Sequence, residues 1–268
     1  MISSVSTNQA SLVGQRNLND VQEAQRRTLN QLSSAKRINS AADDPAASAI
    51  VEQFAAQIAG SGAAVRNLSD GISLAQTADG VLSGVEDNTQ RIRELTVQAG
   101  NSTLSVEDRA AIQGEISSLT QANADSLRNA NYNGQALFQG GSQTFQAGPN
   151  AGDQVSISIG ALSGATGNVD VSSAASATAA LDQIDQDLGT VNSSRASLGA
   201  LNSRFEASIN NLQNRSDNLS AARSRIEDTD YAQAASQLAQ ERIRGDAALA
   251  VQAQANASPR QVLSLLRA

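Results

Sequence analysis

The chain has 268 residues, of which only 2% are aromatic, and a formal net charge of −7. The absence of histidine and cysteine removes disulfides, thiolate nucleophiles, the usual nitrogen and sulfur ligands of zinc and the most common general base, so we expect no enzyme, cofactor or metal site. Nucleic-acid binding needs clustered cations, and the acidic balance and single lysine, Lys36, argue against it.

The scarcity of aromatic residues also bears on the architecture. Because Phe, Tyr and Trp bury the most surface per residue, a chain with few of them must spread small contacts over long surfaces. This favours an elongated helical protein. No apolar run approaches the roughly 20 residues that span a bilayer. Met1 to Leu12 lacks the basic start and apolar stretch of a secretory signal, so any export is expected to need no cleaved leader.

Residues 1–44 carry an apolar stripe that is too thin to form a stable helix alone. Such ends are usually mobile unless something holds them, and the simplest anchor is another copy of the protein. The segment ends where Asp44 can cap a helix whose first turn begins with Pro45. Asp43 and Asp44 could instead hold a metal or do acid-base chemistry, but beside Pro45 capping is favoured. The stripe consists of Val5, Leu12, Leu18, Val21, Leu29 and Leu32.

A long helix is predicted from Pro45 onward, with apolar residues at helical spacing from Phe54 to Leu82. Asp79 and Glu86 interrupt the strict register, and the pattern resumes one residue earlier. The stripe then runs through Val85, Ile92 and Leu95, and a further helix carries Ile112, Ile116, Leu119 and Leu127.

Between residues 132 and 175 the helical period disappears. Asn133-Gly134 and several glycines punctuate short runs at 143–146 and 154–159, which predicts one or two β-hairpins. In the second run Val and Ile alternate with Ser, as in a strand with one buried face. The stretch 160–180 is small, polar and low in complexity, and is interpreted as a loop or a reduced outer domain.

Residues 176–226 carry the most regular pattern. Steps of three and four residues from Leu181 to Ile226 reach fourteen positions, and ten of these are large and apolar. The exceptions are Arg195, Asn202, Ser216 and Arg223, as expected where a 3.6-residue helix drifts against a 3.5-residue pattern. Since neither long stripe can be buried alone, the two should pack together. The ten positions are Leu181, Ile184, Leu188, Val191, Leu198, Phe205, Ile209, Leu212, Leu219 and Ile226.

Residues 227–268 resemble the N-terminal segment, because they also carry a weak apolar stripe. Asp228 and Asp230 are interpreted as the end of one helix and the start of the next. Ser258-Pro259 is interpreted as a second cap that starts a short final helix. The apolar residues here are Leu238, Ile243, Leu249, Val262, Leu263, Leu265 and Leu266.

Together these patterns predict a mainly α fold, a long antiparallel helical bundle or coiled coil built from the N- and C-terminal segments with a small central β-hairpin region. Five segments are expected. They are 1–44, bundle helices at 45–131, the hairpin and outer region at 132–175, a bundle helix at 176–226, and 227–268.

Short motifs at both ends of the chain resemble bacterial flagellin. Each is weak alone, but their combination and order are specific. The N-terminal motifs are Leu32-Ser33-Ser34, Arg37-Ile38-Asn39-Ser40-Ala41, Asp43-Asp44, Asp70-Gly71-Ile72-Ser73, Ala75-Gln76-Thr77 and Arg91-Ile92-Arg93-Glu94-Leu95. The C-terminal motifs are Ser224-Arg225-Ile226-Glu227-Asp228, Asp230-Tyr231-Ala232 and Val262-Leu263-Ser264-Leu265-Leu266-Arg267.

The resemblance implies a structural subunit that polymerises into the extracellular flagellar filament for swimming. The paired ends, 1–44 and 227–268, would form its inner core, and the centre would face outward. It also implies unfolded export through the flagellar channel, an export chaperone and a cap protein at the growing tip. The residues expected to carry inner-core assembly are Val5, Leu12, Leu18, Leu29, Leu32, Leu249, Val262, Leu263, Leu265 and Leu266.

The chain departs from the flagellin pattern in three places. Ala35-Lys36 stands where a Gly-Leu-like pair is usual, Ala268 follows the terminal Arg267, and the outer domains are nearly missing. The first two leave the resemblance intact. The third bears on antigenicity and filament thickness.

A surface on the N-terminal bundle helices has two interpretations. Arg91, Leu95 and Glu115, with Gln90 beside them, match positions through which stimulatory flagellins bind the flagellin-sensing Toll-like receptor. Arg91 and Leu95 lie one helical turn apart and could present a joint charged and apolar surface. The favoured alternative is that these residues belong to an intersubunit or helix-packing surface.

The expected mechanism is polymerisation coupled to ordering, because fixing mobile ends costs conformational entropy that only apolar burial among copies can offset. The nearest alternative is a flagellar hook-filament junction protein with the same terminal architecture. An amphipathic lipid-surface or coiled-coil scaffold would need basic residues flanking the apolar faces, or heptads that continue through the centre. An enzyme is the remotest choice.

Overall fold

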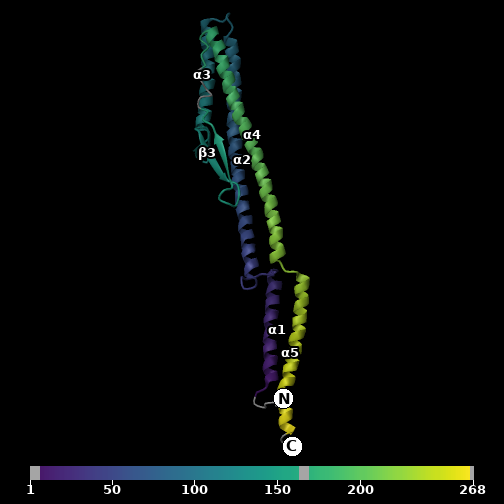
Figure 1. The fold of residues 1–268 in the computed structure, drawn as a ribbon. Helices are drawn as coiled ribbons and strands as arrows, with labels where there is room; N and C mark the ends of the chain where they lie inside the picture. The colour runs from purple at the N-terminus through teal and green to yellow at the C-terminus, as the bar shows by residue number, and fades with distance from the viewer. Residues whose placement is uncertain (1–6, 163–168, 266–268) are drawn as a thin grey trace. The chain divides into compact units, whose positions relative to one another are not determined.

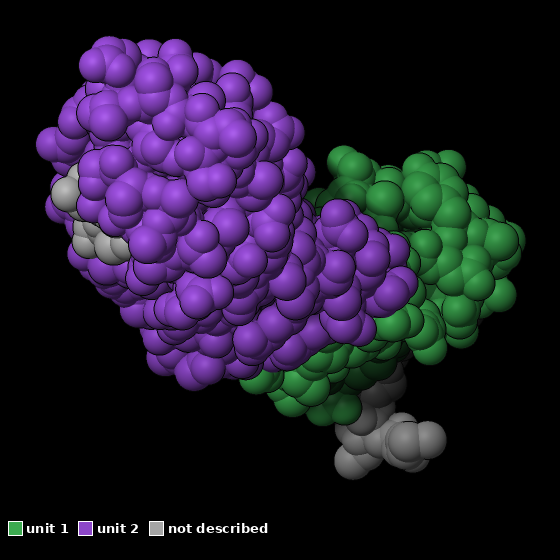
Figure 2. Space-filling model, turned by 90° about the horizontal axis from the view of Figure 1, so that it is seen from above, with its two compact units in different colours: residues 1–55, 218–268 green, residues 56–217 purple. Residues whose placement is uncertain are grey.

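The computed structural model describes residues 7–162 and 169–265, with side chains up to residue 258. The expected mainly helical fold with a small β-hairpin region is confirmed (Figure 1). The chain divides into two compact units, unit 1 with residues 1–55 and 218–268, and unit 2 with residues 56–217 (Figure 2). The elements are α1 (Gln9–Ser34), α2 (Pro45–Ala99), α3 (Val106–Asn129), β1 (Asn131–Tyr132), β2 (Gln135–Ala136), β3 (Gly141–Gln146), β4 (Gln154–Ile159), α4 (Ala174–Glu227) and α5 (Tyr231–Leu265).

In unit 2, α2 and α4 run antiparallel. Arg215 Nη2 lies 3.1 Å from Gln57 Oε1. Farther along α2, Arg93 Nε lies 2.7 Å from Asp185 Oδ1, so residue numbers rise along α2 as those of its partners fall along α4. The predicted stripe of α4 faces inward, because every seventh residue is buried. These residues are Ile184, Val191, Leu198, Phe205 and Leu212.

Helix α3 completes a cluster with the C-terminal half of α2 and the start of α4. Ile112 and Ile116 are buried against Ile92 of α2 and Ile184 of α4. The helix begins with a capping box in which the Ser105 hydroxyl accepts from the Asp108 N–H and the Asp108 carboxylate accepts from the Ser105 N–H. The third helix expected from the sequence is therefore present.

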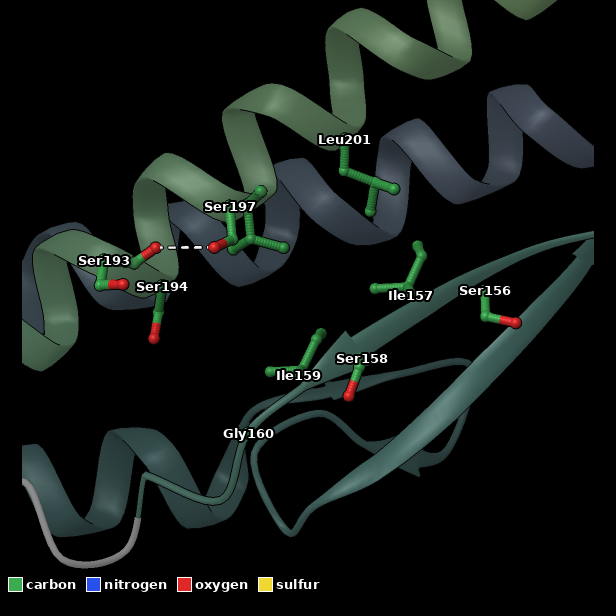
Figure 3. A pocket seen from close by; sticks show the side chains of 10 residues that line it. Ser156, Ile157, Ser158, Ile159, Gly160, Ser193, Ser194, Ser197 and Leu201 are labelled. Atoms are coloured by element: carbon green, nitrogen blue, oxygen red, sulfur yellow. Dashed lines mark hydrogen bonds between the residues drawn. The ribbon is translucent and has the colours of Figure 1, made fainter.

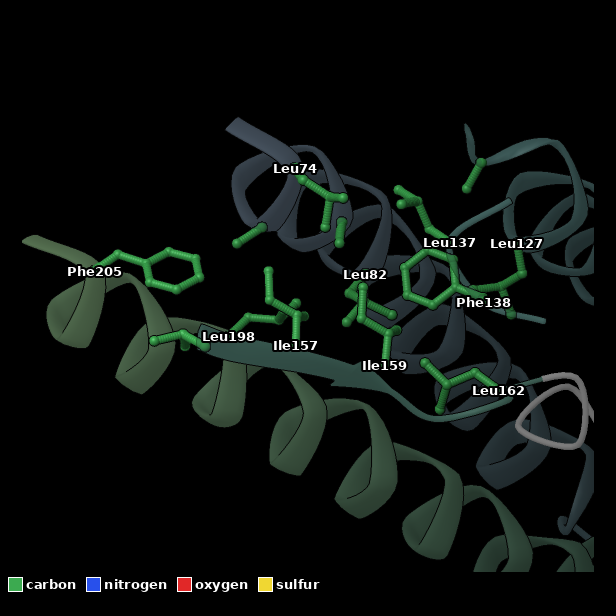
Figure 4. Packing of buried hydrophobic residues seen from close by; sticks show 14 of the residues in the cluster. Leu74, Leu82, Leu127, Leu137, Phe138, Ile157, Ile159, Leu162, Leu198 and Phe205 are labelled. Atoms are coloured by element: carbon green, nitrogen blue, oxygen red, sulfur yellow. The ribbon is translucent and has the colours of Figure 1, made fainter. Parts of the chain in front are cut away.

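Two β-hairpins follow α3, as the turn residues predicted. Asn133 and Gly134, at φ 50° and 78°, form the turn between β1 and β2. Strands β3 and β4 pair antiparallel from Gly141–Ile159 to Gln146–Gln154, so β3 begins two residues before the expected run. The apolar residues of β4 are buried and its serines exposed. Figure 4 shows Ile157 and Ile159 among the buried side chains of the helices.

One glycine on α2 makes room for the largest buried side chain of this core. A Cβ added at Gly71 would lie 2.7 Å from Phe205 Cε2 of α4, so any other residue there would displace the ring. Phe145 of β3 meets the same ring edge-on, with centroids 6.0 Å apart. Phe205 thus joins both long helices to the hairpin.

In unit 1, α1 and α5 form an antiparallel pair held by polar contacts. The Thr28 hydroxyl donates to Glu241 Oε1 at 3.1 Å. The Tyr231 hydroxyl donates to the Leu32 carbonyl at 3.2 Å. The residues buried between the two helices are small, namely Gly14, Thr28, Ala234 and Gly245.

The expectation of a separate final helix at Ser258-Pro259 is wrong, since α5 continues through this pair to Leu265. Proline lacks an N–H, so it leaves the carbonyl four residues earlier without its helical donor. That carbonyl belongs to Ala255, and Asn8 Nδ2 donates to it at 2.8 Å. A contact distant in sequence therefore replaces the bond that Pro259 cannot make.

The two connections within unit 1 are joined to each other. The Arg37 N–H donates to the Glu227 carbonyl at 2.6 Å, and the Thr229 N–H donates to the Ala35 carbonyl at 3.0 Å. Lys36 Nζ lies 2.5 Å from the Glu227 carboxylate, whose side chain is 9% exposed. Ala35 adopts φ 57° and ψ 14°, the left-handed conformation that favours glycine.

The acidic residues of these connections act mainly as caps, as expected for Asp44. Its Oδ1 accepts from the Ala47 N–H at 3.0 Å at the start of α2. Asp230 does the same for α5, accepting from Ala232 and Gln233. Asp43 instead accepts from the N–H groups of Ser40 and Asn39, and these bonds lower the pKa of its carboxyl.

Candidate functional site

Exposed apolar side chains are concentrated in unit 1. Among the described residues, ten large apolar side chains are at least 43% exposed, and eight of these belong to unit 1. Their concentration in one unit makes unit 1 the candidate region for contacts with other copies. The eight are Leu12, Val13, Leu29, Ile50, Tyr231, Ile243, Leu249 and Val251.

The cores of the two units differ correspondingly. Both hydrophobic clusters of buried residues lie in unit 2. In the described part of unit 1, the buried apolar residues are Ile38, Val51 and Ala234. Unit 1 therefore buries mainly small and polar groups between α1 and α5 and leaves many of its large apolar groups exposed, unlike the usual helical pair.

The predicted inner-core residues lie partly on this exposed surface. Leu12, Leu29 and Leu249 are 56%, 46% and 54% exposed. Leu18 and Leu32 are half-buried on α1. Val5 and Leu266 lie outside the described residues, and Val262, Leu263 and Leu265 lie on α5 beyond the last described side chain.

The sequence stripe missed several exposed apolar residues. Val13, Ile50, Tyr231 and Val251 fall outside the residues that it assigned to assembly, yet each is at least 43% exposed. A stripe selects one side of a helix, whereas the exposed apolar residues of α5 point in several directions. The signal available in the sequence was the Leu12-Val13 pair, because adjacent residues of a helix point about 100° apart and so extend beyond a narrow stripe.

The surface predicted around Arg91 forms only in part. Arg91 Nη2 lies 3.1 Å from Glu115 Oε1, and both side chains are about half exposed. Gln90 is exposed beside them. Leu95, however, is 3% exposed and packs in the cluster with Ile92 and Ile116. Leu95 therefore does not contribute to a joint surface with Arg91, because the stripe of α2 turns it into the helical core.

Charge is distributed unequally between the units. Unit 1 contains 11 basic and 10 acidic residues, whereas unit 2 contains 8 basic and 16 acidic ones. The whole net negative charge of the chain is thus carried by unit 2. Copies that pack through unit 1 would meet little like-charge repulsion, because long-range repulsion scales with net charge.

A groove of about 260 Å³ lies between β4 and α4 (Figure 3). Serines dominate its lining, which includes Ser156, Ser158, Ser193, Ser194 and Ser197. No acidic or basic side chain lines it, so this groove offers no group for proton transfer at neutral pH. Elsewhere in the described chain, no helix is both long and apolar enough to cross a membrane.

Comparison with known proteins places these features in a family. The model of the bacterial flagellin N-terminal helical region matches residues 5–143, and that of the C-terminal helical region matches residues 181–266. Flagellin of Halalkalibacterium halodurans is 40% identical over 94% of this chain and 93% of its own length. Flagellin of Bacillus subtilis is 36% identical, covering 91% of this chain and 93% of its own length.

Solved structures show the same fold. The crystal structure of Bacillus cereus flagellin aligns with a TM-score of 0.52 and 24% identity, covering 59% of this chain and 94% of that one. A flagellar hook-associated protein of Vibrio parahaemolyticus aligns with a TM-score of 0.61 but 13% identity, covering 69% of this chain and 99% of that one. This second likeness concerns the fold alone and does not favour the junction-protein alternative.

Paired terminal helices with outward apolar groups and a separate folded core define a self-assembling helical filament subunit. The chain belongs to the bacterial flagellin family. It is a structural subunit of the flagellar filament, an extracellular assembly that serves motility.

Proposed function

We propose that filament assembly buries the exposed apolar side chains of unit 1 against neighbouring copies, and that this burial orders unit 1. The observation that carries the proposal is that eight of the ten most exposed large apolar side chains belong to this unit. Fully burying a Leu, Ile or Val side chain contributes about 1.5–3 kcal/mol. Because these side chains are already half-buried, about 1 kcal/mol each is a reasonable gain.

The summed gain is comparable to what association costs. Eight such groups contribute on the order of 8 kcal/mol per subunit, within the range of 4–15 kcal/mol estimated for lost translational and rotational freedom. Polymerisation on this basis has a threshold concentration. Head-to-tail contacts that do not close generate an open helix, and a helical filament rotated at its base converts torque into thrust.

Substitutions on the exposed surface test this proposal. Ile243→Ser and Leu249→Ser remove apolar groups of α5 that are 69% and 54% exposed. We expect the threshold concentration for filament growth to rise roughly fivefold for each, which corresponds to about 1 kcal/mol. Val106→Ser is the matched control, because Val106 is 74% exposed but lies in unit 2. Equal thresholds for Ile243→Ser and Val106→Ser would contradict the proposal.

A deletion tests the assembly role predicted for the inner-core residues near the C-terminus. Removing residues 259–268 should leave unit 2 folded, since its clusters contain no residue beyond Leu212. It should also abolish filaments. Circular dichroism and electron microscopy of the truncated protein give the two readouts, and normal filament growth would refute the assignment.

We infer that Gln90, Arg91 and Glu115 have a second role, which is recognition by the flagellin-sensing Toll-like receptor. The inference is supported by the resemblance to flagellin and by the joint exposure of the three side chains. An intersubunit contact is the alternative use of the same residues. Receptor activation by monomer should fall for Arg91→Ala with Glu115→Ala. Arg93→Ala with Asp185→Ala removes a similarly exposed ion pair of unit 2 and serves as the control. Equal activity of both variants would remove the receptor hypothesis.

Delivery to the filament is the remaining part of the proposal. The resemblance supports unfolded export through the flagellar channel, a chaperone that holds the chain before export, and a cap protein at the growing tip. It also supports export without loss of a leader, which the intact mass of filament subunits would test. The five-segment organisation can be tested by limited proteolysis, with first cuts expected at the connections 35–44 and 228–230.

A further inference from the structure

Most of the buried residues of α4 repeat along the helix and do not by themselves determine how it is aligned with α2. Val191 and Leu198 are seven residues apart and both aliphatic, whereas Phe205, seven residues farther on, fits the space beside Gly71. Sliding α4 along α2 by seven residues, about 10 Å, would bring equivalent apolar residues to equivalent positions. Apart from Phe205, which would leave the space beside Gly71, the stripe distinguishes poorly between such alignments, and other contacts must contribute to selecting one.

A group of three charged residues interrupts this repetition within unit 2. Arg195 Nε lies 2.9 Å from Asp79 Oδ1, and Arg195 Nη1 also bonds the carboxylate of Glu86. Asp79 and Glu86 are themselves seven residues apart on α2, so one planar guanidinium of α4 spans one heptad of its partner. These are the residues at which the apolar patterns of both helices are broken.

Only in the observed alignment can Arg195 pair with both carboxylates, those of Asp79 and Glu86. Sliding α4 by seven residues in one direction would place Leu188 where Arg195 now lies and move Arg195 away from Glu86. Sliding in the other direction would place Asn202 there and move Arg195 away from Asp79. The Glu86 side chain is 17% exposed, so losing its cation would leave a largely buried carboxylate with the Gln90 amide as its remaining hydrogen-bond partner.

We propose that Arg195, Asp79 and Glu86 specify the alignment of α2 and α4. Partly exposed ion pairs contribute little to stability. Selecting one register among competing ones is the best-attested role of charged and polar groups in a helical seam. The three residues thus act as specificity determinants for the subunit that enters the filament.

The absence of cysteine allows a direct test by introduced spin labels. Ser69→Cys on α2 and Thr190→Cys on α4 lie at exposed positions that are offset along the helices. Electron spin resonance should give a single distance between labels in the otherwise native protein. In Arg195→Leu with Asp79→Leu and Glu86→Leu, we expect a folded, equally heat-stable protein with a second distance shifted by about 10 Å.

Two further variants make the outcome decisive. Arg93→Leu with Asp185→Leu removes another α2–α4 ion pair, whose nitrogen and oxygen are 2.7 Å apart, and should keep the single distance. Arg195→Glu with Asp79→Arg and Glu86→Arg reverses all three charges and should also keep it, even if the leucine variant does not fold. A single native distance in the folded leucine variant would overturn the proposal. A second distance in the Arg93→Leu/Asp185→Leu variant or in the charge-reversed variant would also overturn it.

Discussion

Asn8 and Ala255 are joined by a hydrogen bond of 2.8 Å from the Asn8 side-chain amide to the Ala255 carbonyl. The same side chain accepts from the Ser11 N–H at 3.1 Å and so caps α1. Because Pro259 cannot donate to Ala255, one asparagine both starts the first helix and completes the last one. This contact links the beginning of α1 to the C-terminal part of α5 within unit 1.

The two functions of Asn8 can be separated by substitution. Asn8→Asp keeps a capping oxygen but loses the amide donor, whereas Asn8→Ala loses both. We expect both variants to raise hydrogen exchange around residues 252–265, and only Asn8→Ala to raise it in the first turn of α1. Asn17→Ala, an exposed asparagine in the middle of α1, is the control. Unchanged exchange near Pro259 in Asn8→Asp would show that the amide donor is dispensable.

Two glycines of α2 should respond oppositely to the same change. Gly71→Ala places a methyl group 2.7 Å from the Phe205 ring and should lower the free energy of unfolding by about 1–3 kcal/mol. A Cβ at Gly84 would meet no atom within 4 Å, so Gly84→Ala should raise it by about 0.5–1 kcal/mol. Urea denaturation of both variants measures the difference, and a loss of stability in both would be inconsistent with this packing.

Ala35→Gly is expected to stabilise the protein, although glycine usually weakens it. A non-glycine residue at φ 57° is strained, and relieving that strain should contribute about 1 kcal/mol. Ala239→Gly, within α5, should cost a similar amount because glycine is a poor helix former. Thermal unfolding of the two variants should shift in opposite directions. A lower midpoint for Ala35→Gly would mean that Ala35 is not strained in solution.

Arg109 closes the connection between α2 and α3. Its three guanidinium nitrogens donate to the carbonyls of Ala99, Asn101 and Leu104 at 3.1, 2.6 and 3.1 Å. A lysine cannot reach all three, so Arg109→Lys should cost about 1–3 kcal/mol. Arg128→Lys, at an exposed position of the same helix, should cost less than about 0.5 kcal/mol. Similar unfolding midpoints for the two variants would argue against this role.

The connection before α2 should weaken in acid. Bonds from the Ser40 and Asn39 N–H groups hold the pKa of Asp43 below its ordinary value of 3.8. A carboxyl with a lowered pKa adds stability above the unfolded-state pKa, and this is lost as pH falls through the folded-state pKa. The difference in melting temperature between native protein and Asp43→Ala should therefore be constant above about pH 5 and shrink below about pH 3.8. A difference that grows in acid would reverse the assigned sign.

Several features follow from short stretches of sequence. The seven-residue repeat of α4, the Asp44-Pro45 start of α2 and the Asn133-Gly134 turn all lie where their local patterns predict. Each depends on groups within one or two helical turns of each other. The stripe also predicted which side of α4 faces the core, because a helix with one apolar face can be buried in only one orientation.

Other features depend on which segments meet. The sequence left Leu95 either on a joint surface with Arg91 or, as the favoured alternative, on an intersubunit or helix-packing surface, and the helices that pack on α2 bury it. It indicated a break at Pro259, but a distant asparagine allows α5 to continue. Arg195, Asp79 and Glu86 were recognised only as irregularities in two separate stripes.

The amino-acid sequence by itself determined the long helices of unit 2, the caps at Asp44 and Asp230, the hairpin turns and the inward faces of the long stripes, because these depend on local periodicity and backbone preference. Only the tertiary structure decided which apolar residues of α1 and α5 stay exposed, how the irregular charged residues pair, and where α5 ends. Those outcomes depend on contacts between residues far apart in the chain, and no local pattern encodes which partner will be present.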